Sequence, residues 1–140
     1  MIEELVVREA RLWLGTPYRH QAATKGAGCD CLGLLRGVWE AIYGDQPLVP
    51  PYSADWDEVS RRDVLLQAAR SHFDEVERSE PVAGDVLLFR MRKGAVAKHL
   101  GICSEPGRFI HSYNGHGVVE NALTPPWLRR VVGIFAFPIR

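Results

Sequence analysis

Apolar residues recur at helical spacing in the first half of the chain and form short strand-like runs in the second half. An amphipathic helix is predicted over residues 2–14, closed by Gly15-Thr16-Pro17. A second helix is predicted after Asp30, because apolar positions follow at i, i+3, i+4 and i+7 until Gly44 ends the pattern. Residues 57–73 show the same spacing and predict a third helix.

From Val76 onward the chain is mostly strands. Runs rich in strand-forming residues cover residues 86–91, 98–103, 108–113 and 131–137. Helices followed by strands predict an α+β fold, with N-terminal helices packed on a C-terminal antiparallel sheet. A length of 140 residues and a hydrophobic content of 46% fit a single domain over residues 1–140.

Cys31 is predicted to lie in the first turn of the second helix, directly after the N-cap residue Asp30. The free N–H groups and the positive end of the dipole at a helix start stabilise a thiolate, so we expect a lowered thiol pKa and a reactive nucleophile. The alternative is that Cys31 is a small core residue, because free cysteine is often buried. This segment alone leaves both readings open.

Two of the predicted strands each carry one histidine. Period-2 alternation places His99 on one face with Gly101 and Cys103, and places His111 on one face with Tyr113. If the two strands are neighbours, one imidazole can take the proton of the thiol and the second can orient the ring of the first. Nucleophile, base and orienting residue together favour a cysteine triad.

These segments together resemble the NlpC/P60 family of cell-wall cysteine peptidases. The resemblance rests on five motifs in the same order, namely Gly15-Thr16-Pro17-Tyr18-Arg19, Asp30-Cys31-Leu32-Gly33-Leu34, Ala83-Gly84-Asp85-Val86, His99-Leu100-Gly101-Ile102-Cys103 and Phe109-Ile110-His111. It implies a papain-like fold in which Cys31 is the nucleophile, His99 the general base and His111 the polar third member.

The resemblance also implies a substrate, the peptide stem of bacterial peptidoglycan, cleaved next to the γ-linked D-glutamate. Tyr18 is expected to contact the substrate or help to stabilise the oxyanion. Asp30 is expected to cap the helix and to meet the free amino group of a stem. Leu32 stands where the family usually has serine, which puts substrate recognition at that position in question. No cofactor is implied.

A narrower resemblance points to the branch encoded among phage tail genes and gene transfer agents. It rests on Cys29-Asp30-Cys31-Leu32-Gly33-Leu34, preceded by Thr16-Pro17-Tyr18-Arg19-His20-Gln21. The first apolar stretch is short and interrupted, so we expect no signal peptide and no membrane insertion. We therefore expect synthesis in the cytoplasm, assembly onto phage-like tail or baseplate proteins, and action at the periplasmic cell wall.

Two proline-rich segments with large aromatics are candidate tail-binding surfaces. The first comprises Pro47, Pro50, Pro51, Tyr52 and Trp56, and the second comprises Pro125, Pro126 and Trp127. Rigid loops with exposed aromatics lose little entropy on binding. The alternative is that these aromatic residues fold back onto the core.

Charge and cysteine content exclude several other classes. Seventeen basic and seventeen acidic side chains cancel, so neither nucleic acid nor an anionic membrane is expected as the main partner. Three cysteines fit a reducing compartment. Cys29 and Cys31 near histidines could suggest zinc, but no second pair of closely spaced ligands follows, so no metal is expected. Cys103 is expected to pack in the core, and the remaining histidines are expected on the surface or in loops, namely His20, His72 and His116.

Two other functions stay open at this point. The chain could be a structural tail or baseplate component with little activity, a reading motivated by Leu32. It could also be an amidase or thiol acyltransferase that uses a similar triad on another substrate.

Overall fold

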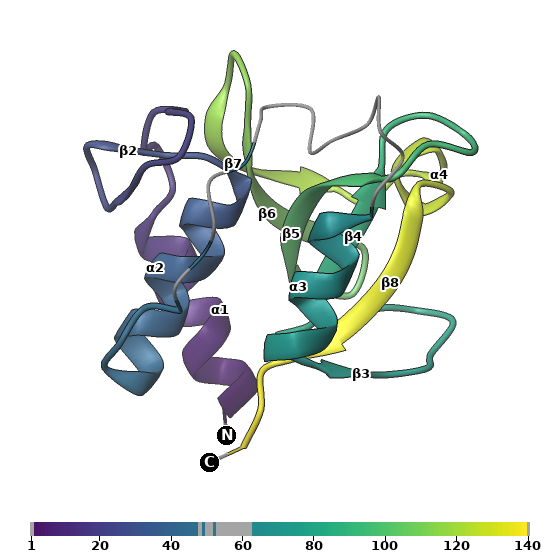
Figure 1. Cartoon of the computed structure of the whole chain (residues 1–140), viewed down its shortest axis with the longest axis horizontal. Coiled ribbons are helices and arrows are strands. Elements are labelled where there is room, and N and C mark those ends of the chain that lie inside the picture. Colours follow the sequence, from purple (N-terminus) through teal and green to yellow (C-terminus); the bar gives the residue numbers. More distant parts are fainter. Residues whose placement is uncertain (1, 48, 50–51, 53–62, 140) are drawn as a thin grey trace.

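The computed structural model describes residues 2–47, 49, 52 and 63–139 (Figure 1). Its helices are α1 (Ile2–Leu12), α2 (Cys31–Tyr43), α3 (Val64–His72) and α4 (Pro125–Leu128). Its strands are β1 (Ala23–Thr24), β2 (Gly28–Cys29), β3 (Asp74–Glu75), β4 (Val86–Arg90), β5 (Ala97–Glu105), β6 (Arg108–Tyr113), β7 (Gly117–Ala122) and β8 (Val131–Ala136).

The larger sheet contains six antiparallel strands in the order β3-β8-β4-β5-β6-β7. Strands β5 and β6, which carry the two histidines, are direct neighbours. Figure 1 shows the N-terminal helices gathered on one side of this sheet. The α+β fold with helices packed on an antiparallel sheet, predicted above, is therefore confirmed.

Each face of the sheet buries its own set of apolar side chains. The face toward the helices includes Leu88, Leu100, Ile102 and Ile110, which pack with apolar residues of α1, α2 and α3. The opposite face carries a smaller cluster, namely Leu87, Phe89, Cys103, Phe109 and Ile134. Alternate residues of β4 and β5 thus enter different clusters, as the period of two requires.

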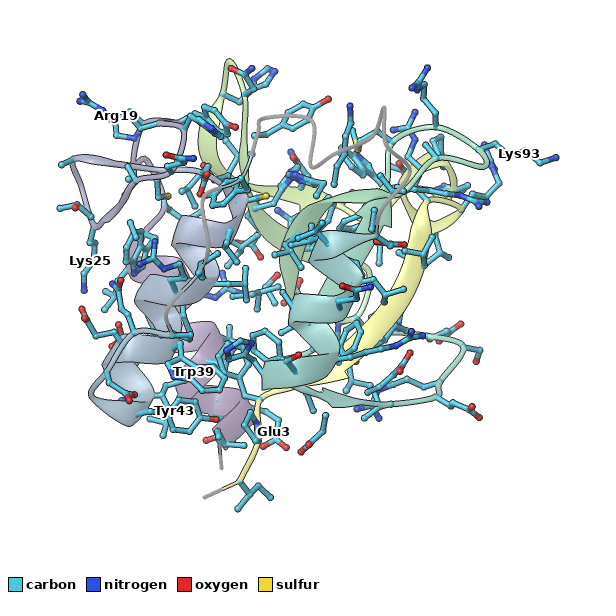
Figure 2. The ribbon with its side chains drawn as sticks, viewed as in Figure 1. Glu3, Arg19, Lys25, Trp39, Tyr43 and Lys93 are labelled. Atoms are coloured by element: carbon cyan, nitrogen blue, oxygen red, sulfur yellow. The ribbon has the colours of Figure 1, made fainter. Side chains whose placement is uncertain are left out.

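Helix α2 forms where its local signals predict it. The side chain of Asp30 accepts a hydrogen bond from the backbone N–H of Gly33, which satisfies one of the free donors at the helix start. Gly44 adopts φ of 90° and donates its N–H to the carbonyl of Glu40, which ends the helix. At the C-terminal end of α2, Trp39 packs against Tyr43 with ring centroids 4.4 Å apart (Figure 2).

Several predicted boundaries shift. Helix α1 ends at Leu12, because a turn replaces its last two predicted residues. In the third helix, Asp63 caps a helix that begins at Val64, and residues 57–62 of that prediction lie outside the described residues. The sequence reasoning did not single out β7 or the short helix α4, in which Pro125 and Pro126 occupy the first turn.

Gly33 sets how closely the preceding loop can cross the start of α2. A Cβ atom at this position would lie 1.8 Å from the carbonyl oxygen of Ala22, a backbone atom. We expect Gly33→Ala to lower the free energy of unfolding by about 1–3 kcal/mol, because loop and helix must separate. Chemical denaturation against wild type tests this, with Glu40→Ala on the exposed face of the same helix as control. Equal stability of Gly33→Ala and wild type would contradict it.

Candidate active site

Cys31 is the first residue of α2, and a backbone bridge joins Tyr18 to Cys29, two residues before it. The Cys29 N–H donates to the Pro17 carbonyl at 3.0 Å, and the Arg19 N–H donates to the Cys29 carbonyl at 3.0 Å. These bonds hold Tyr18 beside the segment that leads into α2.

A cleft of about 270 Å³ opens beside Cys31. Its lining comprises Tyr18, His20, Asp30, Cys31, Tyr52, Met91, Lys98, His99, Ser112, Tyr113 and Asn114. Four of the five residues that the sequence analysis singled out for the site therefore share one cavity. His111 lies behind His99 and is fully buried.

Asp30 is almost fully buried, and its carboxylate has several partners. One oxygen accepts from the Gly33 N–H at 2.7 Å, and the other accepts from the Gln21 N–H at 2.7 Å and from the hydroxyl of Tyr52. The capping role predicted for Asp30 is confirmed. The predicted contact with a substrate amino group remains a prediction, and any such group would have to share a carboxylate oxygen with donors that already occupy it.

The two histidines form a hydrogen-bonded pair across β5 and β6. His99 Nε2 lies 2.7 Å from His111 Nδ1, and His111 Nε2 lies 2.7 Å from Asn121 Oδ1 on β7. His99 therefore keeps its Nδ1 for another partner. Gly101, two residues after His99 on β5, leaves room for the side chains of β6. A Cβ atom at this position would lie 2.9 Å from the ring of Phe109 and 3.4 Å from the Cβ of His111.

Aromatic rings surround this histidine pair. The ring centroid of Trp127, on α4, lies 5.9 Å from that of His99 and 5.2 Å from that of His111. Phe89 lies 5.7 Å from His99, and Phe109 lies 4.2 Å from His111, measured between ring centroids. Trp127 thus packs against the histidines and is half-buried, so only part of its side chain remains at the predicted tail-binding surface.

Burial keeps the thiol and both imidazoles neutral. It raises the pKa of Cys31 to about 12, and the nearby Asp30 carboxylate acts in the same direction. Backbone hydrogen bonds from Leu100 and Leu32 oppose this rise but do not cancel it. The prediction that the helix start lowers the pKa of Cys31 is therefore wrong, because the loss of water around the sulfur outweighs the helix terminus.

The imidazoles shift in the opposite direction. Burial, and then the neighbouring His111, lowers the pKa of His99 to about 3. Burial lowers the pKa of His111 to about 4, although its hydrogen bond to Asn121 acts to raise it. Near neutral pH the resting site therefore holds a thiol and two uncharged imidazoles.

Leu32 does not line the cleft beside Cys31. It is buried and lines a separate apolar cavity of about 90 Å³ between α2 and α3, together with Leu35, Trp39 and Leu65. Residue 32 therefore contributes packing in this chain.

Sequence reasoning missed three residues that complete the site. Asn121 bonds to His111, Trp127 covers the histidine pair, and the Ser112 hydroxyl donates to the Cys29 carbonyl at 2.7 Å. The last bond ties the strand of His111 to the segment that carries Cys31. Alternation along β7 could have placed Asn121 on one face, but only the pairing with β6 sets it beside His111.

The remaining polar candidates lie as follows. Cys103 is buried in the smaller apolar cluster, as predicted, and His116 is exposed and stacks on Tyr113. His72 lines the apolar cavity and contacts the Ala68 carbonyl. His20, expected simply in a loop or on the surface, is exposed and also lines the catalytic cleft.

Neither a metal-ion cluster nor a membrane-spanning helix occurs among the described residues. They contain no group of three or more His, Cys, Asp or Glu side chains arranged to hold a metal ion. None of the helices in this part of the chain is long and apolar enough to cross a membrane.

Comparison with known proteins identifies the class. The NlpC/P60 family model matches residues 15–136, so the chain belongs to the NlpC/P60 family. The chain is 28% identical over 133 residues to "Gamma-DL-glutamyl hydrolase" of Bacillus subtilis (strain 168), covering 94% of this chain and 29% of that protein. It is 27% identical over 111 residues to "Probable endopeptidase NlpC" of Escherichia coli (strain K12), covering 79% of this chain and 62% of that protein. The chain thus spans less than two thirds of either relative.

Solved structures share the fold. The NlpC/P60 domain of the peptidoglycan hydrolase SagA superposes with a TM-score of 0.67 at 21% identity, covering 96% of this chain and 98% of that chain. NlpC1 from Trichomonas vaginalis superposes with a TM-score of 0.69 at 20% identity, covering 97% of this chain and 44% of that chain.

The raised pKa of Cys31 predicts how its reactivity depends on pH. Only the thiolate is alkylated, and below the pKa its fraction grows about tenfold per pH unit. We therefore expect the rate of Cys31 modification by iodoacetamide, followed by mass spectrometry, to rise about tenfold per unit between about pH 7 and about pH 10. Cys31→Ala gives the background from the other cysteines. A constant rate between about pH 5 and about pH 8 would instead indicate a preformed thiolate–imidazolium pair.

Proposed function

We propose that this chain is a cysteine peptidase that hydrolyses the peptide stems of bacterial peptidoglycan. The observation that carries the proposal is the placement of Cys31, at a capped helix start, in one cleft with His99, whose ring is held by His111. Nucleophile, base and orienting residue thus come from three elements of one fold. The two curated relatives, named as a γ-glutamyl hydrolase and an endopeptidase, support hydrolysis of an amide bond.

The first half-reaction transfers one proton. His99 Nδ1 takes the proton of the Cys31 thiol while the sulfur attacks the amide carbonyl, forming the carbon–sulfur bond. Because the resting pair is neutral, proton transfer accompanies the attack. A backbone N–H at the start of α2 holds the negative oxygen that develops, since the first N–H groups of a helix lack partners within the helix.

The second half-reaction restores the enzyme. The imidazolium of His99 gives its proton to the leaving amine as the carbon–nitrogen bond breaks, which leaves a thioester on Cys31. Water, deprotonated by the same nitrogen of His99, then attacks the thioester and releases the acid and the thiol.

The walls of the cleft suit a stem peptide cleaved next to its γ-linked D-glutamate. Lys98 brings a positive charge toward a substrate that carries free carboxylates, and Tyr18 presents a hydroxyl beside the nucleophile. Burial raises the pKa of Tyr18 to about 12, so this hydroxyl stays protonated and can donate to the carbonyl oxygen.

Digestion of defined muropeptides, read by mass spectrometry, tests the proposal. We expect wild type to release the amine product of a γ-D-glutamyl bond, and Cys31→Ala and His99→Ala to lose at least about 10³-fold in rate. Cys103→Ala serves as the matched thiol control, because Cys103 packs on the opposite face of the sheet from the helices. Full activity of Cys31→Ala would contradict the proposal.

Other products would indicate a different function. Cleavage of the bond between sugar and stem would indicate an amidase, and transfer of the acyl group to an added amine or thiol would indicate a transferase. A folded wild-type protein that turns over none of these substrates would favour a structural tail component.

We further propose that the protein acts from a phage-like tail or baseplate and reaches the periplasmic cell wall with it. The support is the resemblance carried by Cys29–Leu34 and the segment before it. Of the candidate binding surfaces, Pro125 and Pro126 are exposed. Trp127 packs on the histidines, Tyr52 bonds to Asp30, and Pro50, Pro51 and Trp56 lie outside the described residues.

Purified particles test this location. We expect an antibody against the chain to detect it in intact particles from producing cells, together with tail proteins. Its absence from particles, combined with its presence in the soluble fraction, would overturn delivery by a tail and favour a role such as the recycling of muropeptides.

A further inference from the structure

The hydrogen bonds that leave His99 end at a third strand. They run from His99 on β5 through His111 on β6 to Asn121 on β7, with both heavy-atom distances at 2.7 Å. In the register of β6 and β7, Asn121 pairs with Phe109 and His111 pairs with Val119. Asn121 is thus the diagonal neighbour of His111 on the same face, within reach of its ring.

The amide of Asn121 determines where each imidazole carries its proton. Oδ1 only accepts, so His111 Nε2 must donate. A neutral imidazole has one N–H, so His111 Nδ1 is left as an acceptor. His99 Nε2 must then donate to it, which leaves a lone pair on His99 Nδ1.

We propose that Asn121 is a positioning residue that selects the tautomer of both histidines and thereby leaves His99 Nδ1 free to act as the base. This inference rests on the proposed function for its kinetic part alone, because the tautomers exist with or without a substrate. The proposal also depends on which atom of the Asn121 amide faces His111. If the amide nitrogen faced His111, every proton in the row would reverse and His99 Nδ1 would carry a hydrogen.

Burial makes this selection consequential. His111 is fully buried and His99 is 7% exposed, so water is a poor substitute for the partner that the two rings give each other, although Asn121 itself lies at the surface. Both rings are neutral near neutral pH, the state in which the position of a single proton matters. A triad held in the wrong tautomer loses about 10⁴ in kcat in a serine protease.

Two substitutions of Asn121 separate the proton-accepting role from packing. Asn121→Asp keeps an acceptor oxygen, replaces the amide nitrogen by a second one, and so has no donor to present to His111. Asn121→Leu keeps a similar volume and removes the acceptor. Gln67→Leu, on the exposed side of α3, is the matched control for replacing an amide by an apolar side chain. Thermal unfolding checks that each variant folds.

The first readout is the ¹⁵N spectrum of histidine side chains in the substrate-free protein. In wild type and Asn121→Asp we expect His99 and His111 each protonated at Nε2. In Asn121→Leu we expect a mixture of the Nδ1 and Nε2 forms. Wild-type His99 protonated at Nδ1 would overturn the proposal, whether or not the protein cleaves peptidoglycan.

The second readout is the pH dependence of kcat on a defined muropeptide. We expect Asn121→Leu to lower kcat about tenfold to about a hundredfold while KM changes little, because the base is present in fewer molecules. Asn121→Asp should retain kcat at alkaline pH. As the pH falls, however, its activity should decline earlier than that of wild type, so the acid limb of its pH profile shifts to higher pH. Its carboxylate favours the charged imidazolium, so it raises the pKa of His111, and a doubly protonated His111 no longer accepts from His99.

Failure of this inference can be told from failure of the proposed function. Folded Asn121→Leu with wild-type tautomers and wild-type kcat would overturn the inference and leave the peptidase intact. A wild-type protein inactive on every muropeptide would overturn the proposed function, and the nitrogen spectra would still decide the role of Asn121. If Asn121→Leu fails to fold, the spectra of wild type and Asn121→Asp decide it.

Discussion

The buried carboxylate of Asp30 is the interaction on which the rest of the site depends. A carboxylate that is 2% exposed is stable only when donors satisfy it, and its donors come from three separate segments. Gly33 belongs to α2, Gln21 to the loop before it, and Tyr52 to the segment between α2 and α3. Gln21 adopts φ of 64°, unusual for a residue other than glycine, and in this conformation its N–H reaches Asp30. The same group that places Cys31 also opposes its ionisation, because its negative charge raises the pKa of the adjacent thiol.

Asp30 therefore has two opposing effects on Cys31: it fixes the position of the residue at the helix start, and it raises the pKa of the thiol. The burial that surrounds these groups keeps the thiol protonated and the imidazoles uncharged. In the mechanism proposed, the nucleophile becomes charged only as the bond to the substrate forms, so the base must already present its lone pair. The aromatic cover of Trp127 and the amide of Asn121 meet this demand in different ways. Trp127 packs against both imidazole rings, and Asn121, in the inference proposed above, orders their protons.

Leu32 shows how one position of a family motif can differ while the fold stays the same. At this position the family's usual serine would offer a hydroxyl beside the nucleophile, whereas Leu32 fills an apolar cavity between α2 and α3. On the proposed function, polar recognition near Cys31 falls to the other walls of the cleft, where Tyr18, His20 and Lys98 lie. The curated relatives are longer than this chain, which aligns with 29% of one and 62% of the other.

The sequence by itself determined the features that depend on near neighbours in the chain. Asp30 and Gly44 bound the helix that begins at Cys31, and alternation placed His99 and His111 on predictable faces, because capping and strand period are local properties. Tertiary structure decided which strands are neighbours, and so which partner each histidine has. Asn121 stands ten residues from His111 and reaches it only through the pairing of β6 with β7, while Trp127 returns to the pair through a short helix after β7. The pKa of Cys31 likewise depends on both levels. The local sequence places the thiol at a helix start, but the burial that outweighs this effect comes from side chains distant in the chain.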